Sequence, residues 1–210
     1  MNSVKKLQLN TIVSLLNRLV VMVSGLILPR MIISAYGSET NGLVSSVTQF
    51  LGIITFLDLG VGSVVQSALY KPLALQDNKS ISRILVAAKS YFRKIAFILI
   101  IYILLLIVLI PTIIDNESLD ILSTIFLIIA ISISQFARYY FGIVNEFLLN
   151  ADQKEYIQLT AEILVVVLNL IASIFLIQRG YPIYTVKLVS SILFLIRPIF
   201  LYYYVKKIII

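Results

Sequence analysis

Long apolar runs without charges constrain this chain more than any other feature of its sequence. Residues 95–114 are twenty consecutive residues with no charged side chain, and residues 121–137 and 163–178 form two more uncharged runs. About 20 mostly apolar residues are enough for a helix to cross the hydrocarbon core of a bilayer. Of the 210 residues, 60% are hydrophobic and 13% are charged, which is too few charges for the surface of a soluble domain. The sequence therefore predicts an all-α, polytopic membrane protein.

The apolar pattern predicts six transmembrane helices that form one unit along the whole chain. Turn-forming or polar residues separate them, among them Gly37, the segment 115–117 and the tripeptide 180–182. Asp152 and Glu155 are three residues apart, a spacing typical of a capping box at the start of the fifth helix. The predicted spans are residues 9–35, 42–69, 95–114, 120–143, 153–178 and 183–205.

Basic residues are distributed very unevenly between the two predicted sides of the membrane. With the N-terminus inside, the inner segments hold eleven of the 17 Lys and Arg residues, the outer loops hold only Arg179, and five lie within spans. Cytoplasmic loops of membrane proteins carry an excess of Lys and Arg. We therefore expect both termini in the cytoplasm. We also expect the first span to be an uncleaved signal anchor, because no small-residue cleavage site follows it.

The predicted inner segment 71–94 combines basic residues with an apolar helical stripe. Ile81, Leu85 and Phe92 recur at helical spacing, while Lys89 and other basic residues lie mainly off that stripe. Basic amphipathic helices of this kind lie on anionic membrane surfaces. We expect a cytoplasmic basic amphipathic segment that anchors the chain at the interface. Capture of an anionic lipid head group is the alternative role.

The chain has no Cys and no His. This composition excludes disulfides, thiol catalysis, zinc or haem sites built on these ligands, and catalytic triads that contain His. The sequence also contains no Gly-rich phosphate-binding loop and no nucleophile elbow. We therefore expect no enzymatic activity, no cofactor and no metal site.

Charged residues inside the predicted spans give them a net charge of +3, five cations minus two anions. A charge at the bilayer centre costs about 2.5–3.5 kcal/mol on the insertion scale, so it usually faces a bundle interior or an aqueous cavity. The surplus of cations indicates a water-filled cationic cavity for an anionic head group, because Arg forms paired hydrogen bonds with phosphate. The alternative is a set of internal salt bridges between helices, with snorkelling side chains near the span ends. The seven residues are Arg18, Arg30, Asp58, Arg138, Glu162, Lys187 and Arg197.

Polar residues recur at helical spacing in the first two predicted spans. Asn10, Ser14, Asn17 and Ser24 follow steps of four, three and seven residues, and Gln49 belongs to a similar stripe in the second span. These stripes are typical of a cavity wall. They are also typical of close helix packing, because small residues let backbones approach one another.

Residues 36–74 carry the motifs that resemble a known family. Their sequence is YGSETNGLVSSVTQFLGIITFLDLGVGSVVQSALYKPLA, and the tripeptide LPR precedes them at 28–30. The Tyr36-Gly37 turn, the segment SSVTQFL, and the segment FLDLGVGS followed by LYKPLA resemble the start of bacterial polysaccharide exporters. More narrowly, they resemble the O-antigen or capsule flippase branch of the multidrug/oligosaccharidyl-lipid/polysaccharide exporter superfamily. The resemblance covers about residues 10–95.

The resemblance implies a two-lobed fold in which each lobe is a six-helix bundle beside a cationic central cavity. It implies translocation of an undecaprenyl-pyrophosphate-linked oligosaccharide across the bacterial cytoplasmic (inner) membrane, by alternating access, for the synthesis of surface polysaccharide such as capsule or the O-antigen of lipopolysaccharide. The implied partners are this anionic lipid-linked substrate and the bilayer, and no nucleic acid.

The candidate substrate-binding residues combine the resemblance with the sequence pattern. Arg18 is the first candidate that the resemblance implies, followed by Arg30 and Arg138, and the polar stripes add Asn17 and Gln49. We expect two acidic residues to act as ion-pair or positioning residues. They are Asp58, which we expect to pair with Arg18, and Glu162.

The chain differs from the family in its length, because the sequence predicts only one lobe. We therefore expect an N-terminal half that needs a second lobe or a second copy of itself. A membrane-inserted fragment without transport activity is one alternative. Half of a multidrug exporter is another, although such a protein favours acidic cavity residues. A polysaccharide polymerase or acyltransferase is the third alternative, and it would show a large outer loop.

Overall fold

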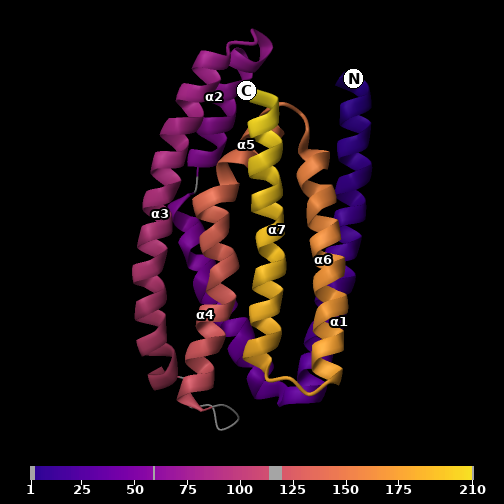
Figure 1. Ribbon diagram of the computed structural model, residues 1–210, viewed down its shortest axis with the longest axis vertical. Helices are drawn as coiled ribbons and strands as arrows, with labels where there is room; N and C mark the ends of the chain where they lie inside the picture. Colours follow the sequence, from indigo (N-terminus) through magenta and orange to yellow (C-terminus); the bar gives the residue numbers. More distant parts are fainter. Residues whose placement is uncertain (1–2, 59, 114–119, 210) are drawn as a thin grey trace.

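The computed structural model describes residues 3–58, 60–113 and 120–209, which form helices joined by short turns (Figure 1). No strand occurs in these ranges, so the all-α prediction is confirmed. Within them, five helices are long and apolar enough to cross a membrane. They are Val4–Leu57, Asn78–Thr112, Ile121–Ala151, Glu155–Gln178 and Ile183–Lys207. The chain therefore has the general character of a membrane protein.

Helix α1 (Ser3–Gly52) contains a sharp bend at Gly37, where φ is 86° and ψ is 165°. This backbone conformation is essentially restricted to glycine. Figure 1 shows the chain running from the N-terminus to the opposite end of the bundle, turning there, and returning toward α2. We call residues 3–36 the first limb of α1 and residues 38–52 its second limb.

The predicted span 42–69 is not one continuous helix. A 3₁₀ helix (Ile53–Leu57) follows the second limb, and α2 (Val61–Ala74) begins after Gly60, whose φ is 84°. A left-handed residue at this point breaks the helical hydrogen-bond ladder, which hydropathy alone does not reveal.

The remaining helices form a bundle beside the limbs of α1 (Figure 1). The first limb packs along α6, which packs on α7, and α7 packs on α4, while α2 contacts both α3 and α5. Helices α4 and α5 are joined by a π-helical turn, so they run as one element. The bounds are α3 (Asn78–Ile113), α4 (Ile121–Ala137), the π-helical turn (Arg138–Gly142), α5 (Ile143–Ala151), α6 (Glu155–Gln178) and α7 (Ile183–Ile209). The polar break predicted at 115–117 lies outside the described residues.

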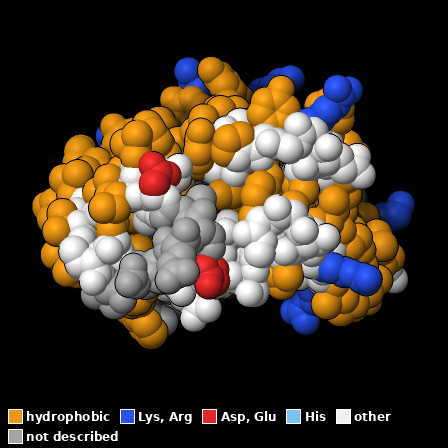
Figure 2. Space-filling view, turned by 90° about the horizontal axis from the view of Figure 1, so that it is seen from below, with side chains coloured by type: hydrophobic (Ala, Val, Ile, Leu, Met, Phe, Trp, Pro, Cys, Tyr) orange, Lys and Arg blue, Asp and Glu red, His pale blue; other side chains and the backbone are white. Residues whose placement is uncertain are grey.

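The bundle has apolar side chains both in its core and on its outer surface. Val47, Leu69, Phe92 and Leu201 are fully buried between the helices. Large hydrophobic side chains remain exposed on the outside, for example Val108, which is 66% exposed. Seen from the end opposite the termini, hydrophobic side chains surround much of the bundle (Figure 2). Such a surface suits contact with lipid rather than water.

The basic amphipathic segment predicted at 71–94 does not form a separate helix. Residues 75–77 form a turn, and α3 then continues without a break from Asn78 into the apolar run. Ile81, Leu85 and Phe92 of the predicted stripe are buried in the protein core, and α3 packs against α2 and α5. The apolar stripe therefore faces protein instead of a membrane surface.

The capping box predicted for the fifth helix is also not formed. Helix α6 starts at Glu155, and the side chain of its N-cap residue Lys154 forms no capping hydrogen bond. Asp152 instead lies 2.6 Å from Lys154 Nζ and 3.4 Å from Lys6 Nζ. The cap comes from the first limb, because Asn10 Oδ1 accepts a hydrogen bond from the backbone N–H of Tyr156 at 2.8 Å.

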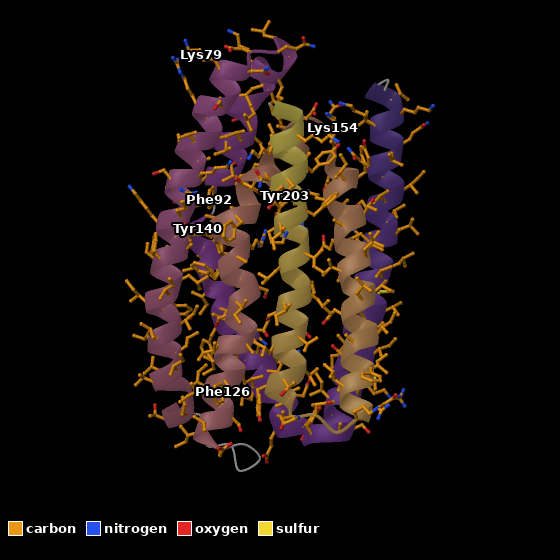
Figure 3. The ribbon with its side chains drawn as sticks, in the orientation of Figure 1. Lys79, Phe92, Phe126, Tyr140, Lys154 and Tyr203 are labelled. Carbon is orange, nitrogen blue, oxygen red and sulfur yellow. The ribbon has the colours of Figure 1, made fainter. Side chains whose placement is uncertain are left out.

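Both ends of the chain lie at the same end of the bundle (Figure 1). Lys79, which begins α3, and Lys154, which precedes α6, lie toward that end as well (Figure 3). We call this the terminal end. The terminal end carries the basic segments that the sequence pattern assigns to one side of the membrane.

Candidate functional site

A cavity of about 490 Å³ lies between the two limbs of α1, α6 and α7. Its wall is mostly apolar but carries several polar side chains, and we call it the polar cavity. It is far from the terminal end, because its wall includes Asn41, just after the bend at Gly37, and Lys187, near the start of α7. Several hydroxyl and amide groups line the cavity. They belong to Ser24, Asn41, Ser45, Thr48, Gln49 and Asn169.

Lys187 is the charged side chain in this cavity wall. It is half-buried, and it makes no ion pair or hydrogen bond with any residue that the structure describes. A buried cation without a partner is costly in free energy, so water or an anionic ligand is needed beside it. The sequence pattern counts Lys187 among the charges within the predicted spans, and the rotation of α7 places it in the cavity wall.

Part of the polar lining is already engaged within the protein. Thr48 Oγ1 donates to the carbonyl oxygen of Val44 at 2.7 Å, and Ser173 Oγ lies 3.4 Å from Asn169 Oδ1. Both hydroxyls and amides keep further hydrogen-bonding capacity after one bond. The wall can therefore bind a hydroxylated ligand without first breaking the helices.

A second group of charges links α5, α6 and α7 in the interior. Glu146 lies 3.2 Å from Arg197 Nη2 and 3.6 Å from Arg138 Nη2, and Arg197 Nη1 lies 3.5 Å from Glu162 Oε2. The Glu146 side chain is only 11% exposed, whereas that of Arg138 is 42% exposed. We call these four residues the charge cluster. It is electrically neutral, with two cations and two anions.

The π-helical turn places Arg138 in the charge cluster. This turn adds one residue to the helix between α4 and α5, and such insertions are frequent at functional sites. Gly142 permits close packing there, because a Cβ on it would lie 3.0 Å from Pro198 Cβ of α7. The turn and α7 are thus held together next to Arg197.

The charge cluster changes the interpretation of two predicted residues. Arg138 is a predicted cavity residue, but Glu146 neutralises it, which matches the alternative of internal salt bridges. Glu162 forms an ion pair as expected, and its partner is Arg197. Glu146 lies between the predicted spans 120–143 and 153–178, so the apolar pattern does not place it among the membrane charges. With Glu146 included, these charges sum to +2, five cations minus three anions.

Asp58 does not pair with Arg18 in the structure. Asp58 Oδ2 accepts a hydrogen bond from the Tyr139 hydroxyl at 3.3 Å, and the described ion pairs do not include Arg18. Asp58 follows the 3₁₀ helix at the end of the second limb, whereas Arg18 is exposed on the first limb.

The other predicted substrate-binding residues are distributed over different surfaces. Arg18 and Arg30 are exposed on the first limb and are not part of the cavity wall, whereas Gln49 does line the cavity. Asn17 is 8% exposed, and its Nδ2 has no hydrogen-bond partner among the described residues. The cavity wall therefore contains Lys187 with several amides and hydroxyls, and none of the predicted arginines.

Comparison of the chain with protein-family models, with curated proteins and with solved structures found no match.

Proposed function

We propose that this chain forms one lobe of a flippase for an anionic lipid-linked oligosaccharide. The observation that carries the proposal is Lys187, a cation without a described partner in the wall of the polar cavity. A phosphate or pyrophosphate group supplies the missing negative charge. The amides and hydroxyls of the same wall suit the hydroxyl groups of sugars.

The specific substrate proposed is an undecaprenyl-pyrophosphate-linked oligosaccharide. Support comes from the resemblance of residues 36–74 to polysaccharide exporters and from the pairing of a cation with sugar-binding groups in one cavity. A multidrug exporter for cationic compounds is less well supported, because the charged residue in the cavity wall is a lysine.

The proposal includes a topology of six passes with both termini in the cytoplasm of a bacterium. Each limb of α1 would supply one pass, with α2 completing the second, and the four other long helices would supply the remainder. The uneven distribution of basic residues supports the inward orientation of the terminal end. The cavity would then open toward the outer half of the cytoplasmic membrane.

The proposed mechanism is alternating access against a second lobe or a second copy of this chain. Lys187 would hold the phosphate group, and Gln49 and Asn169 would bind sugar hydroxyls beside it. Arg18 and Arg30 are exposed on the first limb, so they would reach the substrate only if a partner lobe covered that face. The charge cluster would keep α5, α6 and α7 together as one body during the movement.

The proposal is tested by measuring the binding of farnesyl pyrophosphate and of uncharged farnesol to the purified full chain in detergent. Replacing Lys187 by Met keeps an unbranched side chain that is one heavy atom shorter and removes the charge. We expect about tenfold weaker binding of the pyrophosphate, unchanged weak binding of the alcohol, and no loss of thermal stability. The matched control is Lys94→Met, because Lys94 is exposed on α3 and lies outside the cavity.

Equal binding of the pyrophosphate by the wild type and by Lys187→Met would contradict the proposed site. Translocation itself is measured in proteoliposomes with a fluorescent lipid-linked oligosaccharide and a quencher that reaches only the outer leaflet. Translocation no faster than in protein-free liposomes would favour the alternative of a membrane-inserted fragment without transport activity.

A further inference from the structure

A second pocket, of about 250 Å³, lies at the terminal end of the bundle between α3, α5 and α7. We call it the interfacial pocket. Its position follows from Lys206, which lies four residues from the end of the chain and therefore near the labelled C-terminus in Figure 1. The residues that matter for its chemistry are Ser82, Val86, Lys89, Asn145, Tyr202 and Lys206.

Two lysines in this wall have no ion-pair partner among the described residues. Lys89 and Lys206 form no ion pair or hydrogen bond with residues that the structure describes. The Lys89 ammonium lies 5.9 Å from the centroid of the Tyr202 ring, which holds the cation at the pocket without neutralising it. Two unneutralised ammonium groups in one pocket favour an anion.

Asn145 adds a buried acceptor that also lacks a partner. The residue is 1% exposed, and its Nδ2 donates to the carbonyl oxygen of Phe141 at 2.9 Å. Since a carbonyl oxygen only accepts, this bond fixes Nδ2 and leaves Oδ1 for another group. Oδ1 has no hydrogen-bond partner among the described residues, and Asn145 lines the pocket. A hydroxyl or another donor on the occupant would satisfy this oxygen, while the lysines favour negative charge.

The rest of the wall is mostly apolar and open toward the outside. Val86 is 64% exposed and Tyr202 is 41% exposed, so apolar surface leads from the pocket to the lipid-facing side of the bundle. A soluble phosphate compound would gain nothing from this surface, whereas an acyl chain would bury it. Basic pockets between transmembrane helices at the cytoplasmic side are known to bind anionic lipid head groups.

We propose that the interfacial pocket binds the head group of an anionic phosphoglycerol lipid. Lys89 and Lys206 bind the phosphodiester, and Asn145 Oδ1 accepts a hydrogen bond from a glycerol hydroxyl. A zwitterionic ethanolamine lipid is disfavoured, because its ammonium group would lie near two lysines. This site does not depend on the proposed transport function, since it shares no residue with the polar cavity.

The site is tested by native mass spectrometry of the full chain in detergent, with added phosphatidylglycerol or phosphatidylethanolamine of identical acyl chains. The test variant is Lys89→Gln combined with Lys206→Gln. The control is Lys79→Gln combined with Lys207→Gln, which removes two exposed lysines from the same two helices outside the pocket. Both variants lower the net charge by the same amount. A difference between them therefore distinguishes lipid binding in the pocket from non-specific electrostatic attraction to a basic protein.

We expect the wild type to retain phosphatidylglycerol at least tenfold more strongly than phosphatidylethanolamine. The pocket variant should lose about tenfold in affinity for phosphatidylglycerol, and the control should change by less than twofold. Equal losses in both variants would overturn the proposal, and so would equal retention of the two lipids. Displacement of the lipid by millimolar glycerol 3-phosphate would also overturn it, since the site would then bind the soluble phosphate rather than a lipid.

Discussion

Asn10 of α1 caps helix α6 at Tyr156, across 146 residues of sequence. Asn10 Oδ1 accepts the Tyr156 backbone N–H at 2.8 Å, while Asn10 Nδ2 donates to the carbonyl oxygen of Gln153 at 3.1 Å. One amide side chain thus satisfies a free helix N–H and fixes the turn before α6. This pair of bonds secures the first limb of α1 against the rest of the bundle at the terminal end.

We predict that Asn10→Ala lowers the free energy of unfolding by about 1 kcal/mol, the usual cost of losing a helix cap. Hydrogen exchange should show faster exchange of the Tyr156 amide. The control is Thr11→Ala, because the Thr11 hydroxyl bonds only within its own helix, to Leu7 at 3.0 Å. An unchanged exchange rate at Tyr156 in Asn10→Ala would contradict the capping role.

This cap explains one limit of prediction from the sequence. The local pattern of Asp152 and Glu155 favours a capping box, but the structure uses Asp152 for Lys6 and Lys154 and takes the cap from Asn10. A tertiary contact overrode the local pattern. The apolar runs, by contrast, predicted the all-α class and the long helices after residue 94, because a spanning helix is recognised by length and composition alone.

The candidate site was less predictable than the fold, because it depends on the rotation of each helix. Gln49 lies in the cavity as its polar stripe suggested, but Arg18 and Arg30 face outward. Lys187 is one of the charges within the predicted spans, and it does line the cavity. Hydropathy gives the depth of a residue and not its direction. Direction is set by packing against neighbouring helices.

Glu146 is predicted to be the most important member of the charge cluster for stability. It contacts both Arg138 and Arg197, whereas Glu162 contacts Arg197. Removing one partner of a buried ion pair leaves an uncompensated charge, so Glu146→Gln should cost about 3 kcal/mol. Glu162→Gln should cost less, since Arg197 keeps Glu146. Denaturation of the purified variants in mixed micelles measures both changes, and equal costs would contradict the central role of Glu146.

Asp77 is predicted to make the start of α3 sensitive to acid. Hydrogen bonds from the Ser80 hydroxyl at 2.5 Å and the Ser80 N–H at 3.1 Å lower the pKa of Asp77 below its ordinary value of 3.8. Because the folded pKa is the lower one, this stabilisation is present above pH 3.8 and is lost as the pH falls through the folded value. Asp77→Asn should therefore differ most from the wild type near neutral pH.

The measurement for Asp77 is the melting temperature of wild type and Asp77→Asn across the acidic range. The difference between the two proteins should narrow as the pH falls. Ser80→Ala keeps the carboxyl group but removes the hydroxyl that lowers its pKa most strongly, so it should reduce the same pH dependence. A difference that stays constant with pH would show that the charge of Asp77 has no part in stabilising α3.

Gly37 is predicted to be essential for the bend between the two limbs of α1. Its φ of 86° and ψ of 165° lie in a region that other residues enter at a cost of about 1–3 kcal/mol. Gly42 provides a matched control in the same helix, because a Cβ at either glycine would meet nothing within 4 Å. Gly37→Ala should therefore destabilise the protein by its backbone conformation alone, while Gly42→Ala should be neutral or stabilise it by about 0.5–1 kcal/mol. The measurement is the melting temperature of both variants. Equal changes in the two variants would mean that the bend does not depend on the glycine at position 37.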